Sequence, residues 1–235
     1  MDNMNELKPV VALDGPAGSG KSTVAGLVAE QLKFVHADSG AIYRTLTLGY
    51  MEKLGPGDTA TAFGESLSGE RPAPASLECR IEMVDGRQTA FLSGQEVGDR
   101  IRSREVTERI VTIADDPECR VEVNRILREF AGQQALVVDG RDIGTVVFPD
   151  TPYKFFLDAS ARVRAERRRG ELIQRGLGDA AVDELEAEIE RRDEGDRNRT
   201  IGALRQAEDA ILIDTSELTI EAVVQRILSH LQIKF

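Results

Sequence analysis

Residues 15–22, Gly-Pro-Ala-Gly-Ser-Gly-Lys-Ser, match the pattern G-x-x-x-x-G-K-[ST] at every fixed position. A short apolar run at 10–13 precedes this loop, and apolar residues recur at helical spacing over 24–32 after it. In such a strand–loop–helix context, glycines turn backbone N–H groups toward phosphate oxygens, and the following helix adds the positive end of its dipole. Lys21 can reach the β and γ oxygens, and the Ser22 hydroxyl can ligate Mg²⁺. We therefore predict a site for a nucleoside triphosphate with Mg²⁺, formed by Gly15, Pro16, Ala17, Gly18, Ser19, Gly20, Lys21, Ser22 and Thr23.

The rest of the chain alternates short apolar runs with helical patterns. Further strands are expected at 34–37, 135–138, 154–157 and 210–213, and the last three runs are each followed by an aspartate. Helices are expected at 41–54, 104–114, 118–130, 160–169, 180–193 and, behind an N-cap at Thr219, 220–232. This order predicts the α/β fold of P-loop NTPases, with a doubly wound parallel sheet of five strands in a single domain over 1–235.

Two segments interrupt that order. Alternation at 79–83, the turn signal Asp85-Gly86 and a return strand at 88–92 predict a small antiparallel β insertion within 63–105, in which 68–74 is a Gly/Pro-rich loop. Gly170–Gly178 is expected to break the preceding helix, so that 164–178 forms a short, mobile lid.

Composition excludes several classes of protein. Thirty basic against 41 acidic residues give a net charge of −11, which argues against nucleic acids and membrane surfaces as partners. The apolar runs are far shorter than the ~20 residues that a membrane helix needs. The first residues, MDNMNELK, contain no apolar segment and predict no secretory signal. The two cysteines, Cys79 and Cys119, are expected to be free thiols in a reducing cytoplasm.

Three further segments carry groups suited to phosphate. In Asp38-Ser39-Gly40-Ala41-Ile42-Tyr43-Arg44, Ser39 is expected to cap a helix and to offer its hydroxyl to an anion, with Arg44 one turn further on. Residues 139–145, Asp-Gly-Arg-Asp-Ile-Gly-Thr, follow a predicted strand, at the sheet edge where ligands bind. In the third segment, 162–199, Arg164 and Arg168 are expected to share one helix face at i, i+4 spacing.

At these residues the sequence resembles the bacterial cytidylate kinases of the nucleoside monophosphate kinase group. The shared segments are GPAGSGKST at 15–23, DSGAIYR at 38–44, DGRDIGTVVFPD at 139–150, FLDAS at 156–160 and RRDEGDRNR at 191–199. The resemblance implies an ATP-dependent kinase that phosphorylates CMP or dCMP with Mg²⁺ and acts as a cytoplasmic monomer.

The resemblance also implies roles for particular residues. The phosphate of the monophosphate would be held by Ser39, Arg44, Arg141, Arg199 and Arg102. Arg120 and Asp142 would read cytosine, and Arg192 and Asp196 would bind the sugar. Arg164, Arg167 and Arg168 would close on ATP from the lid, and catalysis would depend on Lys21, Arg141, Arg164, Arg168 and Arg199. A serine that helps to read the base in relatives aligns with Val111, and Thr112 is one residue out of register, so the strictness of cytosine choice stays open.

Two alternatives remain at the level of sequence. The chain lacks the Asn-Lys-x-Asp segment of GTPases and is too short for a large motor ATPase. It could still be a P-loop kinase of another small anionic acceptor, such as UMP, AMP or a non-nucleotide acid. It could also be a nucleotide-binding switch protein, but a switch needs no second anion pocket.

Overall fold

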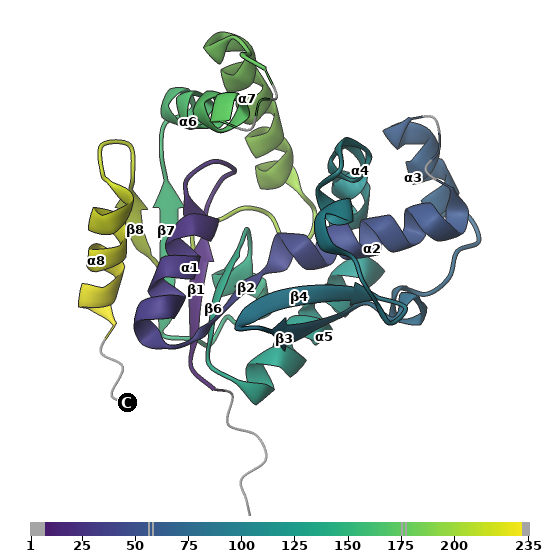
Figure 1. Ribbon diagram of the computed structural model, residues 1–235, viewed down its shortest axis with the longest axis horizontal. Helices are drawn as coiled ribbons and strands as arrows, with labels where there is room; N and C mark the ends of the chain where they lie inside the picture. Colours follow the sequence, from purple (N-terminus) through teal and green to yellow (C-terminus); the bar gives the residue numbers. More distant parts are fainter. Residues whose placement is uncertain (1–7, 56, 58, 175, 177, 232–235) are drawn as a thin grey trace, which may run out of the picture. The chain divides into compact units, whose positions relative to one another are not determined.

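The computed structural model describes residues 8–55, 57, 59–174, 176 and 178–231. These residues form two compact units, and each is described by itself (Figure 1). The P-loop unit comprises Pro9–His36 and the chain from Ala135 onward, and the inserted unit comprises Ala37–Gln134.

A five-stranded sheet forms the centre of the P-loop unit, as the sequence predicts. Its strand order is β2-β6-β1-β7-β8, with bounds β1 Val10–Asp14, β2 Val35–Asp38, β6 Leu136–Gly140, β7 Tyr153–Asp158 and β8 Ile211–Asp214. The β1 strand is parallel to both of its neighbours, β6 and β7, and β7 is parallel to β8. The chain leaves β1 at the point where strand order diverges to the two sides, which is where doubly wound sheets bind ligands.

One face of this sheet is covered by α1 (Lys21–Leu32) and α8 (Ile220–His230), which pack on each other (Figure 1). Their apolar residues form one buried cluster with strand residues such as Leu13, Val137 and Ile213. The Thr219 side chain accepts a hydrogen bond from Ala222 N, so the predicted cap of α8 is confirmed. This packing fixes the end of β1 and the start of α1, and with them the loop between.

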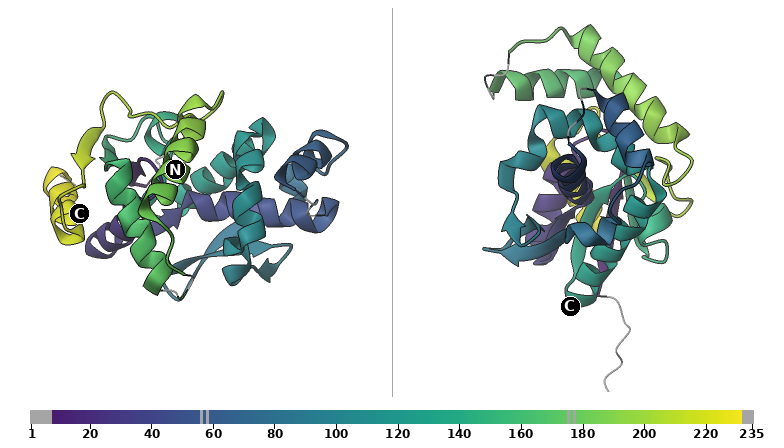
Figure 2. Two further views of the ribbon diagram at one scale, coloured as in Figure 1. Left: turned by 90° about the horizontal axis from the view of Figure 1, so that it is seen from above. Right: turned by 90° about the vertical axis from the view of Figure 1, so that its right-hand side faces the viewer.

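Helices α6 (Ala161–Gln174) and α7 (Val182–Asn198) lie side by side (Figure 2). The expected helix end at Arg169 is wrong, because α6 continues through Gly170 to Gln174, although this end still lies within the predicted 170–178 segment. Leu172 packs against a small apolar cluster with Leu185 and Ile189 of α7, and this packing offsets the ~1 kcal/mol that a glycine costs within a helix. Of the predicted lid, residues 175 and 177 lie outside the described residues, so the lid stays a prediction.

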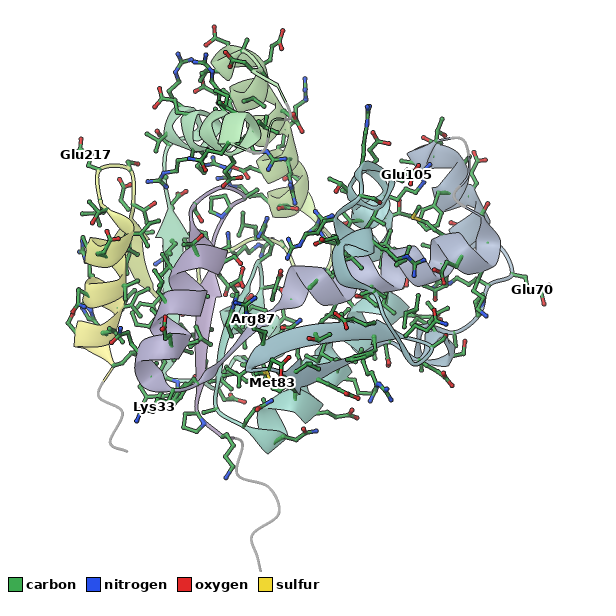
Figure 3. All side chains as sticks on the ribbon, viewed as in Figure 1. Lys33, Glu70, Met83, Arg87, Glu105 and Glu217 are labelled. Carbon is green, nitrogen blue, oxygen red and sulfur yellow. The ribbon has the colours of Figure 1, made fainter. Side chains whose placement is uncertain are left out.

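The inserted unit is larger than the predicted 63–105 insertion. It contains α2 (Ser39–Leu54), α4 (Arg104–Asp115) and α5 (Pro117–Gln133), which pack against one another. The predicted antiparallel hairpin is confirmed as β3 (Arg80–Val84) and β4 (Arg87–Leu92), joined by an exposed turn between Met83 and Arg87 (Figure 3). A short third strand, β5 (Gln95–Glu96), pairs with β4.

Helix α3 (Ala60–Ser68) has no counterpart in the sequence expectations, which place the start of a β insertion there. The Thr59 side chain accepts a hydrogen bond from Ala62 N, and Phe63 and Leu67 bury one face of the helix. Only two apolar side chains anchor it, so the helical periodicity is too short to recognise. Short helical turns complete the chain at η1 (Pro74–Leu77), η2 (Gly98–Arg102) and the π-helical η3 (Ile143–Val147).

Candidate active site

The loop between β1 and α1 has the backbone geometry of a phosphate cradle. Gly15, Gly18 and Gly20 have φ values of 147°, 77° and 88°, which side chains rarely tolerate. At Gly15 a Cβ atom would lie 2.0 Å from the carbonyl oxygen of Leu157, so only glycine fits there. The loop is closed on itself, because Lys21 Nζ donates to Pro16 O at 2.6 Å and lies 3.3 Å from Ser19 Oγ. The ammonium group of Lys21 is thus held at the loop.

Charged groups of both signs surround Lys21. Burial and the neighbouring Arg141 guanidinium lower the pKa of Lys21, whereas the carboxylates of Asp139 and Asp14 oppose that shift. Arg192 lowers it further. A buried cation beside two arginines is costly in isolation, and this cost falls when a polyanion binds among them.

Asp14 links the end of β1 to the loop that follows β6. Its two carboxylate oxygens accept hydrogen bonds from Ile143 N at 2.8 Å and Gly144 N at 2.7 Å. Burial nevertheless raises the pKa of Asp14 to about 6. Our sequence analysis did not identify this residue, although the signal was present: β1, like β7 and β8, ends at an aspartate.

Asp139, at the end of β6, faces His36 at the end of β2. The Asp139 Oδ1 and His36 Nε2 atoms are 2.6 Å apart. Such a contact orients the carboxylate, as hydrogen-bonded partners orient metal-binding groups in general. The carboxylate of Asp139 is therefore fixed near Lys21 before any ligand binds.

Asp196, on α7, holds two of the predicted phosphate-binding arginines. Its Oδ2 accepts from Arg141 Nε at 2.8 Å, and its Oδ1 lies 2.8 Å from Arg199 Nη2. Burial opposes ionisation of this carboxyl, but Arg141 and Arg199 hold its pKa below the usual range. The structure thus brings together Arg141 and Arg199, with Arg192 close enough to add its own charge.

The α7 helix is longer than predicted, and this extension carries Asp196. The sequence pattern placed the helix end near Asp193, but α7 runs to Asn198. The buried contacts of Asp193 and Asp196 stabilise this last turn. It has no apolar periodicity from which the sequence could predict it.

The three predicted lid arginines have different environments. Arg167 donates to Thr215 Oγ1 at 3.1 Å and Thr215 O at 2.5 Å, next to the β8 end. Arg168 is half exposed and lies 3.3 Å from Glu171. Arg164 is buried, and its Nη1 donates to Ala17 O in the P-loop at 3.1 Å. Arg164 and Arg168 are four residues apart on α6 and so share a face as expected, but Arg164 is buried and Arg168 is half exposed.

In the inserted unit, the cap of α2 differs from expectation. Asp38, not Ser39, is the N-cap: its Oδ1 accepts from Ala41 N at 3.1 Å, while Ser39 is the buried first residue of the helix. An aspartate is as good a cap as serine, so the neighbouring residue could take this role. The Gln88 side chain bonds both backbone groups of Asp38, accepting from its N at 2.7 Å and donating to its O at 3.3 Å.

Arg44 and Arg102 also lie near this helix start. Arg44 Nη1 donates to Thr107 Oγ1 at 2.8 Å and Ile101 O at 3.2 Å. Arg102 Nη2 lies 3.8 Å from Asp38 Oδ2. Within this unit, the structure therefore gathers Ser39, Arg44 and Arg102 around the first turns of α2.

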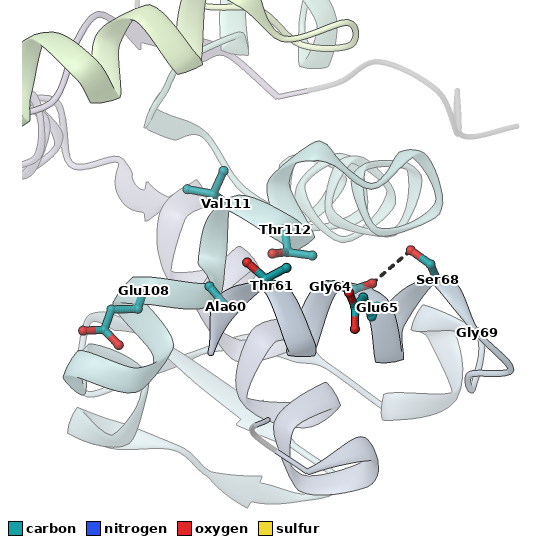
Figure 4. A pocket seen from close by; sticks show the side chains of 9 residues that line it. All are labelled: Ala60, Thr61, Gly64, Glu65, Ser68, Gly69, Glu108, Val111 and Thr112. Carbon is teal, nitrogen blue, oxygen red and sulfur yellow. Dashed lines mark hydrogen bonds between the residues drawn. The ribbon is translucent and has the colours of Figure 1, made fainter. Parts of the chain in front are cut away.

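The residues predicted to read the base are buried. Arg120 donates to Ala114 O at 2.8 Å, and its guanidinium carbon lies 5.6 Å from the centre of the Tyr43 ring. Asp142, in the P-loop unit, is the first residue before η3 and is 4% exposed. Val111 is 48% exposed; it lines, with Thr112, a shallow groove of about 840 Å³ between α3 and α4 (Figure 4). The valine thus presents methyl groups at a surface where a serine would present a hydroxyl.

Oxygen donors near Lys21 suit Mg²⁺. The Ser22 hydroxyl opens α1, and the Asp14 and Asp139 carboxylates lie around Lys21. No group of three or more His, Cys, Asp or Glu side chains among the described residues could hold a metal ion. Mg²⁺ needs none, because it usually binds one or two carboxylates together with substrate phosphates and water.

The two cysteines are buried, and burial raises the pKa of each thiol to about 12. They are free, as predicted, and unreactive at neutral pH. None of the helices in the described part of the chain is long and apolar enough to span a bilayer.

A phosphate-binding loop between β1 and α1, at the centre of a five-stranded parallel sheet, defines a P-loop protein. Arg141 and Arg199, which directly follow β6 and α7, form a second cationic group in the same unit, as expected for a P-loop kinase that binds an anionic acceptor. The model of the cytidylate kinase family matches residues 11–233, and the chain belongs to that family.

Individual relatives agree over nearly the whole chain. This chain is 41% identical over 219 residues to a cytidylate kinase of Caldicellulosiruptor bescii, with 93% of each chain covered. It is 42% identical to one of Exiguobacterium sibiricum, over 92% of this chain and 94% of the relative. An Enterobacter cytidylate kinase is 40% identical, over 97% of this chain and 96% of its own.

A comparison of structures supports the fold. The solved structure of an uncharacterized protein from Eubacterium ventriosum matches with a TM-score of 0.51 at 11% sequence identity, covering 97% of this chain and 100% of that one.

Proposed function

We propose that this protein transfers the γ-phosphoryl group of ATP to CMP or dCMP, giving ADP and CDP or dCDP. The observation that carries the proposal is the double ion pair at Asp196, which holds Arg199 together with Arg141, a neighbour of Lys21. A nucleotide switch has no use for this second cationic site. Membership of the cytidylate kinase family narrows the acceptor to a cytidine monophosphate.

The reaction needs no general base. The second phosphate pKa of a monophosphate is about 6, so the attacking oxygen is already ionised at neutral pH. The difficulty is to bring two polyanions together in line, and Lys21, Arg141 and Arg199 offset their repulsion. Arg168, on the exposed side of α6, would complete this set from the predicted lid.

Asp196 sets how strongly these arginines bind an acceptor. The ion pairs with Asp196 hold the guanidinium groups of Arg141 and Arg199 in place. The negative charge of Asp196 also offsets part of their positive charge. An incoming phosphate adds further acceptors to the same guanidinium groups. The site is therefore preorganised, and the arginines need not be recruited from solvent.

The triphosphate would be held by the loop residues 15–23, with Arg167 beside them. For the acceptor we propose Ser39, Arg44, Arg102, Arg120, Asp142, Arg192, Asp196 and Arg199. Ser22 would hold Mg²⁺, with the Asp139 and Asp14 carboxylates as partners for its water ligands. Bound there, the ion would neutralise charge on the phosphates and help to orient them.

The test is an ADP-release assay with ATP-Mg²⁺ and CMP, dCMP, UMP or AMP. We expect release that depends on CMP or dCMP, with AMP inactive. Release with UMP would show that Val111 relaxes the choice of base. Acceptor-independent release would favour a switch protein, and release only with UMP or AMP would favour another small-acceptor kinase.

We propose that the protein acts in the cytoplasm, in pyrimidine metabolism, because its proposed substrates are free nucleotides. We also propose that the protein acts as a monomer, because the residues assigned to both substrates come from one chain. Sedimentation at assay concentration tests this: activity confined to a larger species would contradict it.

A further inference from the structure

The guanidinium of Arg164 joins three segments of the P-loop unit. Its Nη1 lies 2.6 Å from Asp193 Oδ2 on α7, and the two side chains are 4% and 2% exposed. The same nitrogen donates to Ala17 O in the P-loop at 3.1 Å, and Nε donates to Ala159 O at 2.9 Å, just before α6. In addition, a Cβ at Gly18 would lie 3.3 Å from Arg164 Cβ, so this side chain rests against the loop.

The partner of Arg164 lies on the same helix face as the partner of the acceptor arginines. Asp193 and Asp196 are three residues apart on α7, which places them on one face about 4.5 Å apart along the helix axis. Both are buried. One face of α7 is therefore connected through Asp193 to the P-loop backbone, and through Asp196 to Arg141 and Arg199.

Stability alone does not explain a buried pair at this place. Both charged groups of a buried ion pair lose their hydration. Apolar residues of similar size at the same place often stabilise a protein equally well. Helices α6 and α7 already pack through Ala165, Leu185 and Ile189. Arg162–Asp183 and Arg169–Asp179 form further ion pairs at their exposed surface. Of these three pairs, Arg164–Asp193 is the one that also reaches a carbonyl of the P-loop.

We propose that Asp193 is a positioning residue: through Arg164 it fixes α7 relative to the P-loop, so that the nucleoside triphosphate and the acceptor phosphate monoester bind cooperatively. In this arrangement Arg164 acts through the P-loop backbone and α7, in place of closing on ATP from the lid. A triphosphate in the loop fixes the position of Ala17. Through Arg164 and Asp193, this also fixes the last turn of α7, which Arg199 directly follows. By linkage, an acceptor at Arg199 favours the triphosphate to the same degree. The inference rests on the proposed function for the identity of the acceptor.

The test is the coupling between the two ligands in the Asp193→Asn variant. Calorimetric titration gives the affinity for CMP with and without a non-hydrolysable ATP analogue. In the parent we expect the analogue to tighten CMP binding by a factor within the ~5–150-fold range of typical coupled sites. In Asp193→Asn we expect this factor to fall to about twofold or less, with the affinity for each ligand alone changing much less than the coupling.

Two further variants decide the interpretation. Arg162→Ala removes an exposed ion pair between the same helices and should keep the coupling of the parent. The double variant Arg164→Met/Asp193→Leu replaces the buried pair by apolar side chains of similar length, which such sites often tolerate. It keeps the helix packing if Asp193→Asn fails to fold, and it should also lose the coupling.

Unchanged coupling in a folded Asp193 variant would overturn the proposal. So would a parent without coupling, or equal weakening of both ligands with the coupling intact, which is the result of a merely structural role. The proposed function is tested separately, by measuring whether the parent releases ADP when CMP is present. If another monophosphate is the acceptor in that assay, the coupling is measured with that compound.

Discussion

Two faces of the α6–α7 pair use the same chemistry at different depths. On the inner face, Arg164 and Asp193 are almost wholly buried, at 4% and 2% exposure. On the outer face, Arg162 pairs with Asp183, and these side chains are 50% and 85% exposed. Each pair joins an arginine of α6 to an aspartate of α7.

Because the Arg164–Asp193 pair is buried, it can fix the position of α7, whereas the exposed Arg162–Asp183 pair cannot. Water and salt screen the outer pair, and its long side chains lose entropy when they are held together. The inner pair is not screened, so its geometry is fixed and its loss would leave an uncompensated charge. Asp14, Lys21 and Asp196, charged groups of the same unit, are likewise buried.

The largest effect is expected for Lys21, the buried cation of the P-loop. Lys21→Ala should lower the rate of ADP release with CMP by about 10³-fold or more, because it removes a fixed charge from the transferring phosphoryl group. Little stability should be lost, since burial already disfavours the charged lysine in the free protein. The exposed Lys53→Ala is the control and should match the parent. Transfer retained in Lys21→Ala would overturn the phosphate-cradle assignment.

A second test compares two arginines near the end of α7. Arg199 pairs with the buried Asp196, whereas Arg197 is exposed. Arg199→Ala should lower kcat by about 10²-fold or more while ATP affinity changes little, because Arg199 is proposed to act on the acceptor side. Arg197→Ala should leave both unchanged. If Arg199→Ala loses ATP affinity and kcat to the same degree, the proposed role is wrong.

The third prediction concerns stability against pH. Because burial raises the pKa of Asp14 from 3.8 to about 6, its ionised form is disfavoured in the folded protein. Its contribution to stability is complete below pH 3.8 and is lost as the pH rises through about 6. Asn is neutral throughout, so the free energy of unfolding of Asp14→Asn should rise relative to that of the parent by about 2 kcal/mol between pH 4 and 7.

Urea unfolding of Asp14→Asn and parent across this pH range measures that difference. The exposed Asp209, whose pKa is lowered by Lys154, supplies a comparison of opposite sign. Asp209→Asn should lose, not gain, stability relative to the parent as the pH rises. A pH-independent difference for Asp14→Asn would show that its carboxyl titrates normally in the folded state.

The smallest effect is expected at the outer face. Arg162→Ala removes an exposed ion pair, so neither the urea midpoint nor the rate of transfer should change measurably. A clear loss of either would mean that the exposed pairs also position α7. The contrast between the two faces would then no longer hold.

Short-range patterns made much of this molecule predictable. The P-loop is eight consecutive residues, and its glycines impose their backbone geometry locally. Four of the five strands contain compact apolar runs, and the hairpin turn is the dipeptide Asp85-Gly86. Thr219 caps α8 from the position directly before it. In each case neighbours along the chain provide the decisive interactions.

Elsewhere the decisive partners are distant in sequence. Asp14 bonds Gly144, 130 residues away, and Arg141 bonds Asp196, 55 residues away. Gly170 continues a helix because Leu172 packs on another helix. Such contacts leave no periodic pattern in the local sequence. The ends of α6 and α7, expected at Arg169 and Asp193, were therefore predicted wrongly.

By itself, the sequence determined which chemical groups this protein has: a loop that must surround phosphate, strands that must be buried, and an excess of arginine at a few segments. Tertiary structure decided which of those arginines are fixed and which remain in solvent. Arg162 and Arg164 are two positions apart on one helix, yet one is half exposed and the other is bonded to the P-loop. The reason is physical: burial multiplies the strength of a charge–charge contact, and burial is a property of the fold.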